Sequence, residues 1–404
     1  MFGGKSMKIL RKILQSAAAV GAVGLLMYIE MIYSFPPEIT MYNGQPVSSR
    51  LGAGISIGNI PENACVYTGK NTVTPVADGE YNATLKIGAV SYRKVRLRVT
   101  KPQSVCASGS LIGLRIYNNG LIVLGTQRIE TAEGTASPAA DAGICEGDII
   151  TKINGSFPAE GRDVGKLLRD GENSVTVLRG GREQSVTLSP AHDKSGALCI
   201  GAWVRDSTAG VGTMTYYEPE TMTYGALGHG INDSDTGIMF SVQKGTIEKS
   251  SVVSVTKGVR GTPGEICGSF SSMGTIAGTV AKNCDSGIFG SLAADAGIEG
   301  KLYPVGLIGQ VTTGDASILS TVDDEVRSYN IKIVRTMPFG AAAKGLMIKI
   351  TDERLLEKTG GIVQGMSGSP IIQNGKIVGA VTHVLVNDPT SGYGIYIERM
   401  LAAA

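Results

Sequence analysis

A serine flanked by glycines near the end of the chain is the residue best suited to do chemistry. The segment GMSGSP, residues 365–370, leads into an apolar stretch and the turn QNGK, so it lies between two strands. Glycines on both sides let such a loop turn tightly and present the Ser367 hydroxyl. The backbone N–H groups of Gly365 and Ser367 could then converge on a carbonyl oxygen as an oxyanion hole. The segment predicts Ser367 as the nucleophile of an acyl transfer, with Ser369, or a hairpin without chemistry, as the alternative.

A serine hydroxyl needs a general base, and the chain has three histidines. His192 lies in SPAHDKSG, which is typical of a surface linker. His383 lies on the strand after the serine, where we expect it to pack beside the site. His229 precedes the serine in the chain and stands between two glycines on a tight turn. We therefore predict His229 as the base.

The third group of such a site is a carboxylate that fixes the imidazole tautomer. The acidic residues that could serve are Asp233, Asp235, Asp285, Asp323, Asp324 and Asp352. Residue chemistry alone does not rank them. Asp233 and Asp235 follow His229 so closely that turn-forming roles are the simpler interpretation.

Two segments carry a resemblance to a known family. The serine loop between strands is similar to the nucleophile loop of chymotrypsin-like peptidases. Residues 350–401, from ITDERLLEKTGG to GYGIYIERML, and ALGHGINDSDTG at 226–237 resemble the stage IV sporulation protein B peptidases. The resemblance implies a triad of Ser367, His229 and Asp352, with the amides of Gly365 and Ser367 as the oxyanion hole.

The resemblance also implies a biological role. Members of this family are signalling serine endopeptidases of endospore-forming bacteria, exported from the forespore into the space between the two membranes. There they cleave themselves and a membrane-bound regulator, which releases an intramembrane metalloprotease that activates a late sigma factor. The alternatives are a catalytically inactive PDZ scaffold and a general envelope quality-control protease. No cofactor is expected, and no metal, since the chain lacks an H-E-x-x-H motif.

A peptide-binding module is predicted ahead of the peptidase. SPAADAGICEGDIITKINGS, residues 137–156, and the helix and hairpin after it resemble a PDZ domain of bacterial envelope proteases. Such domains bind an extended peptide between a strand and a helix. The residues expected to do so are Leu121, Ile122 and Val123 on the strand, with Val164 and Leu168 on the helix. The alternative is a PDZ domain that packs on its own peptidase domain. Asp148 is predicted to cap a turn.

The N-terminus predicts a membrane anchor. Four basic residues (Lys5, Lys8, Arg11 and Lys12) precede an apolar stretch at 13–35, which is long enough to span a bilayer. The basic flank favours a cytoplasmic N-terminus and an extracytoplasmic remainder. Small residues lie early in the apolar stretch, so an uncleaved anchor is favoured over a cleaved signal peptide.

The amino-acid composition limits the fold class and the possible partners. Of the 404 residues, 42% are hydrophobic and 18% are charged, which excludes a disordered chain. A net charge of +2 from scattered basic residues gives no nucleic-acid groove. The six cysteines form no C-x-x-C pair and are expected to be free, with a disulfide as the alternative. We predict a mainly β chain: a stub and anchor (1–36), a β-rich segment (37–107), a PDZ domain (108–194) and a chymotrypsin-like double β-barrel peptidase domain (195–404).

Overall fold

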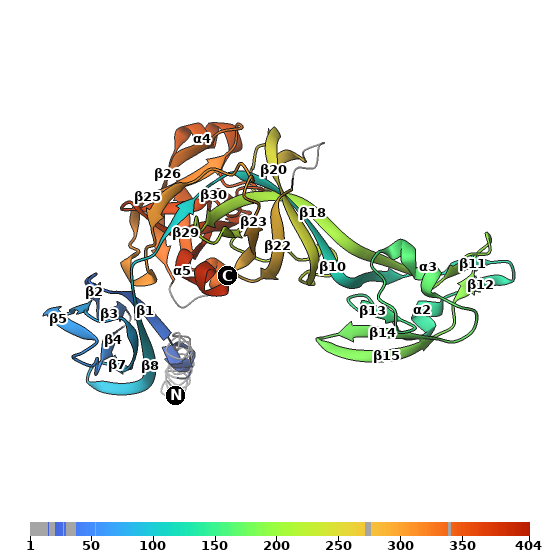
Figure 1. The fold of residues 1–404 in the computed structure, drawn as a ribbon, viewed down its shortest axis with the longest axis horizontal. Coiled ribbons are helices and arrows are strands. Elements are labelled where there is room, and N and C mark those ends of the chain that lie inside the picture. The colour runs from blue at the N-terminus through green and yellow to red at the C-terminus, as the bar shows by residue number, and fades with distance from the viewer. Residues whose placement is uncertain are drawn as a thin grey trace, which may run out of the picture. The chain divides into compact units, whose positions relative to one another are not determined.

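The computed structural model describes residues 15, 21–26, 28–29, 38–52, 54–270, 276–337 and 341–404 (Figure 1). The predicted anchor at 13–35 lies mostly outside these residues. Across the ranges that are described, no helix is both long enough and apolar enough to cross a bilayer. The chain divides into two compact units, and each is described by itself.

The first unit consists mainly of the chain up to Gln103 and contains two sheets. The five-stranded sheet has the order β1 (Glu38–Tyr42), β8 (Val90–Thr100), β7 (Gly79–Ile87), β4 (Ile55–Gly58) and β3 (Arg50–Gly52). The three-stranded sheet has the order β2 (Val47–Ser48), β6 (Thr72–Pro75) and β5 (Cys65–Gly69). On β8, Val95, Leu97 and Val99 are buried and the residues between them are exposed, which is the alternation of a strand with one face in the core.

The second unit begins with a ring of six strands. Pairing runs through β10 (Leu111–Thr126), β20 (Val242–Thr256), β22 (Ile276–Cys284), β23 (Gly287–Leu292), β19 (Thr223–Ala226) and β18 (Ala202–Tyr217), and β18 pairs back with β10. Three further strands extend this sheet: β9 (Ser104–Ala107), β24 (Lys301–Pro304) and β21 (Glu265–Phe270). The ring encloses a buried apolar core that includes Ile112, Ile247 and Ile288.

A second barrel follows in the chain. Its strands close in the order β25 (Gly314–Thr321), β26 (Val326–Thr336), β27 (Leu346–Ile350), β30 (Asp388–Tyr396), β29 (Lys376–Leu385) and β28 (Pro370–Gln373). The helix α4 (Glu353–Thr359) precedes the serine loop, the short 3₁₀ turn η3 (Ala342–Lys344) precedes β27, and α5 (Ile397–Ala403) is the last helix. The 3₁₀ turn η2 (Ile308–Gln310) belongs to the first unit. The mainly β prediction is confirmed, and the two rings supply the pairings of a double barrel.

The strands β10 and β18 run beyond the first ring, side by side (Figure 1). Their far ends join a smaller sheet through β13 (Ile149–Ile153), β14 (Asn173–Arg179) and β15 (Arg182–Leu188). Around it lie β11 (Ile129–Thr131), β12 (Gly134–Ala136), α2 (Pro138–Asp141), η1 (Gly161–Asp163), α3 (Val164–Leu167), β16 (Ala191–His192) and β17 (Leu198–Cys199). This is the segment for which a PDZ domain is predicted. One strand, β10, therefore serves both the small sheet and a barrel.

Candidate active site

The serine loop lies between α4 and β28 and presents one of its two hydroxyls. Ser367 is half-buried, and its Oγ donates a hydrogen bond to the carbonyl of Thr382 on β29 (2.9 Å). Ser369 is fully buried, and its Oγ donates to Ser320 Oγ (3.0 Å). A nucleophile must reach a substrate, so the burial of Ser369 leaves Ser367 as the candidate.

Gly368 shows why this loop requires glycine. Its φ is +99°, and a Cβ at this position would lie 2.0 Å from the carbonyl oxygen of Thr213 and 2.6 Å from the nitrogen of Leu227. The missing side chain therefore lets the serine loop pack directly on β18 and on the segment before His229.

The peptide carbonyls of the serine loop are tied to β18. Thr213 Oγ1 donates to the carbonyl of Gly365 (2.7 Å), and the Thr213 amide donates to the carbonyl of Ser367 (2.9 Å). Over the described part of the chain, the amides of Gly365 and Ser367 have no hydrogen-bond acceptor. Two fixed amides that are free to donate are what an oxyanion hole requires.

The segment before His229 is a strained turn. Leu227 has φ +64°, and the Gly228 amide donates to the carbonyl of Ala226 (2.8 Å), which makes a γ-turn of the rare form. The Leu227 amide donates to the carbonyl of Thr213 (3.2 Å). Strain of this kind persists only where the surrounding contacts hold it, and it is common at functional sites. Thr213 thus binds both the serine loop and the histidine turn.

The histidine turn lies against the strand that follows the serine. A Cβ on Gly228 would lie 3.0 Å from the Cγ2 of Thr382 and 2.8 Å from that of Ile395. The ring centroids of His229 and His383 are 4.9 Å apart. Ser367 bonds to Thr382, so the structure brings Ser367, His229 and His383 into one place. The placement of His383 beside the site is as predicted, while His192 is exposed elsewhere.

The hydrogen bond of His229 fixes its tautomer. Nδ1 lies 2.9 Å from the carbonyl oxygen of Gly230. A carbonyl can only accept, so Nδ1 carries the proton and Nε2 is left with a lone pair. This is the tautomer that a general base requires. Among the described residues, no hydrogen bond joins Ser367 Oγ to this imidazole, and catalytic hydrogen bonds often tighten only when substrate is bound.

Partial desolvation by the surrounding protein keeps both imidazoles of the site neutral, although His229 is only half-buried and His383 is exposed. This desolvation lowers the pKa of His229 and outweighs the opposite effect of the bond to Gly230. Desolvation, the neighbouring His229 and the charge of Lys344 lower the pKa of His383 to about 4. Removing water disfavours the charged form, and two facing imidazolium groups would repel each other. A neutral imidazole is able to take a proton from serine.

The pH profile of activity follows from this. The base works only when His229 is neutral, and its pKa lies below the ordinary 6.5. We expect the acid limb of kcat/KM for a short peptide to have its midpoint below pH 6.5, so that full activity persists at pH 7. Initial rates between pH 4 and 9 measure it, with fluorescence checking that the chain stays folded. A midpoint above 6.5 would contradict the burial of the base.

Asp352 is engaged away from His229. It is the N-cap of α4, where its Oδ1 accepts from the Arg354 amide (3.1 Å) and Nε (3.0 Å), and its Oδ2 accepts from Arg354 Nη2 (2.8 Å) and from the Asn330 amide (3.1 Å). Arg354 first, and then the Asn330 amide, hold its pKa at about 2 against the cost of burial. In the described structure no hydrogen bond joins Asp352 to His229. The implied contact between the two is therefore not formed, because both carboxylate oxygens are used to hold the helix before the serine loop.

Replacing Asp352 with asparagine tests its role. The folded pKa of about 2 lies below the ordinary 3.8, so the ionised group stabilises the fold above about pH 4 and loses that effect as the pH falls towards 2. We expect Asp352→Asn to lower the free energy of unfolding at pH 7 by about 2 kcal/mol, with less than a tenfold change in kcat. Denaturant unfolding and peptide hydrolysis measure the two. A loss of about 10⁴-fold in kcat would show instead that the carboxylate orients the base.

The carboxylates close to His229 form turns, as predicted. Asp233 is buried, and its Oδ1 accepts from the amides of Asp235 (3.2 Å) and Thr236 (2.9 Å). Its Oδ2 pairs with Arg205 of β18. Sequence reasoning missed Arg205 and Thr213. The only signal for Thr213 is the alternation of Thr213 and Thr215, which both bond to carbonyls of the serine loop.

The residues predicted to bind peptide divide into two groups. Leu121, Ile122 and Val123 lie in β10 and are fully buried. On one edge Leu121 and Ile122 pair with β13, and on the other Ile122 and Val123 pair with Arg205 and Val204 of β18. An added strand needs an open edge, so the prediction for this strand is wrong: the chain's own β18 takes the place. Leu168 belongs to the core of the small sheet.

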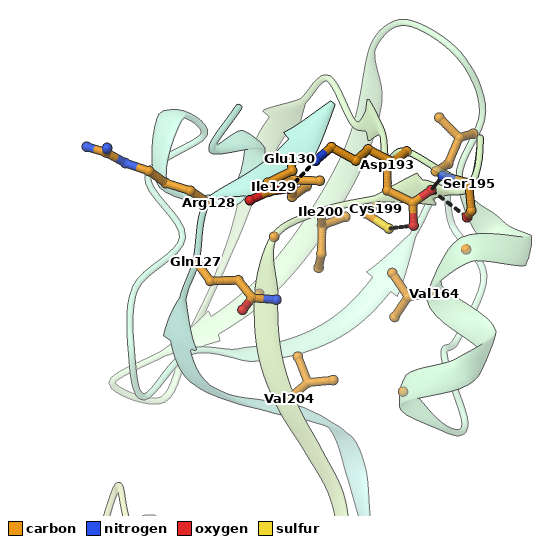
Figure 2. A pocket seen from close by; sticks show the side chains of 16 residues that line it. Gln127, Arg128, Ile129, Glu130, Val164, Asp193, Ser195, Cys199, Ile200 and Val204 are labelled. Carbon is orange, nitrogen blue, oxygen red and sulfur yellow. Dashed lines mark hydrogen bonds and ion pairs between the residues drawn. The ribbon is translucent and has the colours of Figure 1, made fainter. Parts of the chain in front are cut away.

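Val164 belongs to the same core and also lines an open groove of about 610 Å³. Figure 2 shows apolar side chains from several elements around it: Ile129, Val164, Ile200 and Val204. The lining comes from η1 and α3, from the segment that leads from β17 into β18, and from residues 127–130 and 193–195. The Asp148 carboxylate, predicted to cap a turn, accepts from the Cys145 amide (2.9 Å) and pairs with Arg179.

Comparison with known proteins identifies a family. Residues 196–401 match the family model described as SpoIVB peptidase S55. The matched range contains the serine loop, the histidine turn, Asp352 and Thr213. Comparison with the curated proteins gives no match.

Proposed function

The chain belongs to the SpoIVB peptidase S55 family and is a sporulation serine peptidase that acts on protein, and we propose that it is a signalling endopeptidase. It cleaves itself and a membrane-bound regulator, and so triggers the intramembrane activation of a late sigma factor. One observation carries the chemistry: Thr213 holds the serine loop and the histidine turn on one strand, with Ser367 as the accessible hydroxyl.

The proposed reaction is acyl transfer. Nε2 of His229 takes the proton of Ser367, whose Oγ leaves the Thr382 carbonyl and attacks the peptide carbon. The Gly230 carbonyl keeps the proton on Nδ1 and stabilises the imidazolium that forms. The imidazolium then protonates the leaving amine, and water completes the cycle by the same route in reverse.

The amides of Gly365 and Ser367 are proposed to bind the oxyanion. Their availability and the anchoring of the loop carbonyls by Thr213 support this role. Donors fixed in advance cost no reorganisation when the negative charge develops. Asp352 acts through α4, which leads into the serine loop, and its contacts favour positioning over direct contact with the base.

The location of the enzyme is part of the proposal. The apolar stretch at 13–35 anchors the chain, and the basic residues before it hold the N-terminus in the cytoplasm. The chain after the anchor then lies outside the cytoplasm, in the forespore intermembrane space, where the membrane-bound regulator is within reach.

The small sheet is proposed to act as a PDZ domain that captures substrate or regulator. An extended peptide would lie in the groove between α3 and the start of β18, with Val164 and Val204 against its side chains. This places the peptide along β18 rather than along β10.

The test is mass mapping of self-cleavage in the full-length chain. Wild-type protein should yield defined fragments cut between the anchor and the small sheet, and Ser367→Ala protein should stay full length. Mixing the two, with the variant isotope-labelled, shows whether one copy cuts another. Identical processing of both proteins would refute self-cleavage. Broad degradation of unfolded casein would favour a quality-control protease.

A further inference from the structure

The hairpin that follows His229, called the histidine hairpin below, is held by a charged residue of β18. Arg205 on β18 pairs through Nη1 with the Oδ2 of Asp233 and through Nη2 with Asp235 (2.8 Å). The Asp233 side chain is fully buried, whereas that of Arg205 is 31% exposed. A buried carboxylate needs its partner, because an unpaired charge in the interior is costly.

Asp233 sets the shape of the hairpin that follows His229. Its Oδ1 accepts from the Asp235 amide, the Thr236 amide and the Thr236 hydroxyl (2.9 Å), while its own amide donates to the carbonyl of Ile238 (2.7 Å). Asn283 binds the base of the same hairpin at Ile231. The tip of the hairpin thus depends on Asp233, and Asp233 depends on Arg205.

The strand gives Arg205 a fixed position. Arg205 pairs with Ile122 in the β10–β18 register, and Asp206 beside it accepts from the Gly161 amide of η1 (3.0 Å). The same strand carries Thr213, which binds the serine loop and the turn before His229. The strand β18 therefore contacts the histidine segment on both sides, through Thr213 before it and through Arg205 after it.

We propose that Arg205 is a positioning residue for His229: by neutralising Asp233 it keeps the histidine hairpin in the shape that aims the imidazole at Ser367. The role of Arg205 rests on the proposed serine–histidine chemistry. It does not depend on which protein the enzyme cleaves. Arg205 does not touch the substrate, so its loss acts on kcat. A displacement of about 1 Å in a catalytic group can cost about 10²-fold in rate.

The test compares variants of the full-length chain on a short peptide substrate. We expect Arg205→Met to lower kcat by about 10- to 10²-fold with KM unchanged, and Arg205→Lys to recover part of the loss because it keeps one ion pair. Arg205→Met combined with Asp233→Asn should be more active than Arg205→Met alone, since no buried charge is then left unpaired.

Arg179 provides a matched control. It pairs with Asp148, whose buried carboxylate also caps a turn, but it lies in the small sheet. Arg179→Met should lower thermal stability to a similar degree while leaving kcat unchanged. If Arg205→Met keeps the wild-type kcat, or if Arg179→Met lowers kcat equally, Arg205 has only a structural role. A wild-type chain that hydrolyses peptides without cutting itself would overturn the signalling proposal and leave the Arg205 comparison intact.

Discussion

Replacement of Ser367 by alanine should lower kcat for peptide hydrolysis by on the order of 10⁶-fold. The variant loses the only accessible hydroxyl of the serine loop but keeps the glycines and the Thr213 contacts that shape it. Alanine removes one oxygen at a half-buried position, so the unfolding temperature should stay close to that of the wild type. The measurement is the hydrolysis rate at saturating peptide, with thermal unfolding followed in parallel.

Ser369 is the matched control for this variant. It stands two residues away in the same loop, but it is fully buried against Ser320. Ser369→Ala should lose that hydrogen bond at a cost of about 1 kcal/mol and retain most of the activity. Full activity in Ser367→Ala together with loss in Ser369→Ala would make Ser369 the nucleophile and would show that the loop rearranges.

Replacement of His229 by alanine should have an effect of similar size, on the order of 10⁶-fold in kcat. Serine and its base act as one unit, so removing either one stops the proton transfer. We also expect partial recovery when free imidazole is added above pH 7, because the cavity left by the side chain lies beside His383 and, in the proposed mechanism, within reach of Ser367. Hydrolysis rates measured against imidazole concentration test both statements.

The other two histidines are controls for the His229 variant. His192→Ala should behave as wild type, since His192 is exposed and bonds to Asp170 and Gly196. His383→Ala should retain activity within about tenfold, because His383 is a neighbour of the proposed base and takes no part in the proposed proton transfer. A loss in His383→Ala as large as in His229→Ala would identify His383 as the base.

Some features of the candidate site have a signal in local sequence motifs. The glycines at the serine loop and around His229 could be interpreted from sequence, because they mark places where the backbone must turn tightly or pass close to another strand. Gly368 and Gly228 both do so, against Thr213 and Thr382. Ser367 and Ser369 differ in exposure because their side chains contact different parts of the second barrel. These contacts with distant residues cannot be predicted from the residues next to each serine.

Contacts between distant segments could not be predicted. Thr213 lies 152 residues from Gly365, to which its hydroxyl donates. A threonine in a strand gives no signal of this partner, because an alternating pattern fixes a face and not a neighbour. Asp352 shows the opposite case: the family resemblance implied contact with His229, but an N-cap position and Arg354 use both of its oxygens.

The sequence also does not predict which strands pair with the edges of β10. The predicted PDZ domain at 108–194 stays a prediction, and the strands β13, β14 and β15 of the small sheet lie within that range. The PDZ resemblance treated the strand at 121–125 as a peptide acceptor, although β10 continues from the barrel and already has a partner on each edge. Sequence patterns record that a strand is buried, and they do not say which strand covers it.

The central claim is that Ser367 is a hydroxyl activated by His229, and covalent labelling tests it most directly. Folded full-length chain is treated with a fluorophosphonate at pH 7, and the modified peptide is identified by mass. We predict one adduct, on Ser367, that forms in the wild type and in Ser369→Ala and is absent from His229→Ala. Absence of any adduct on the folded wild-type chain, or an equal rate in His229→Ala, would contradict the account.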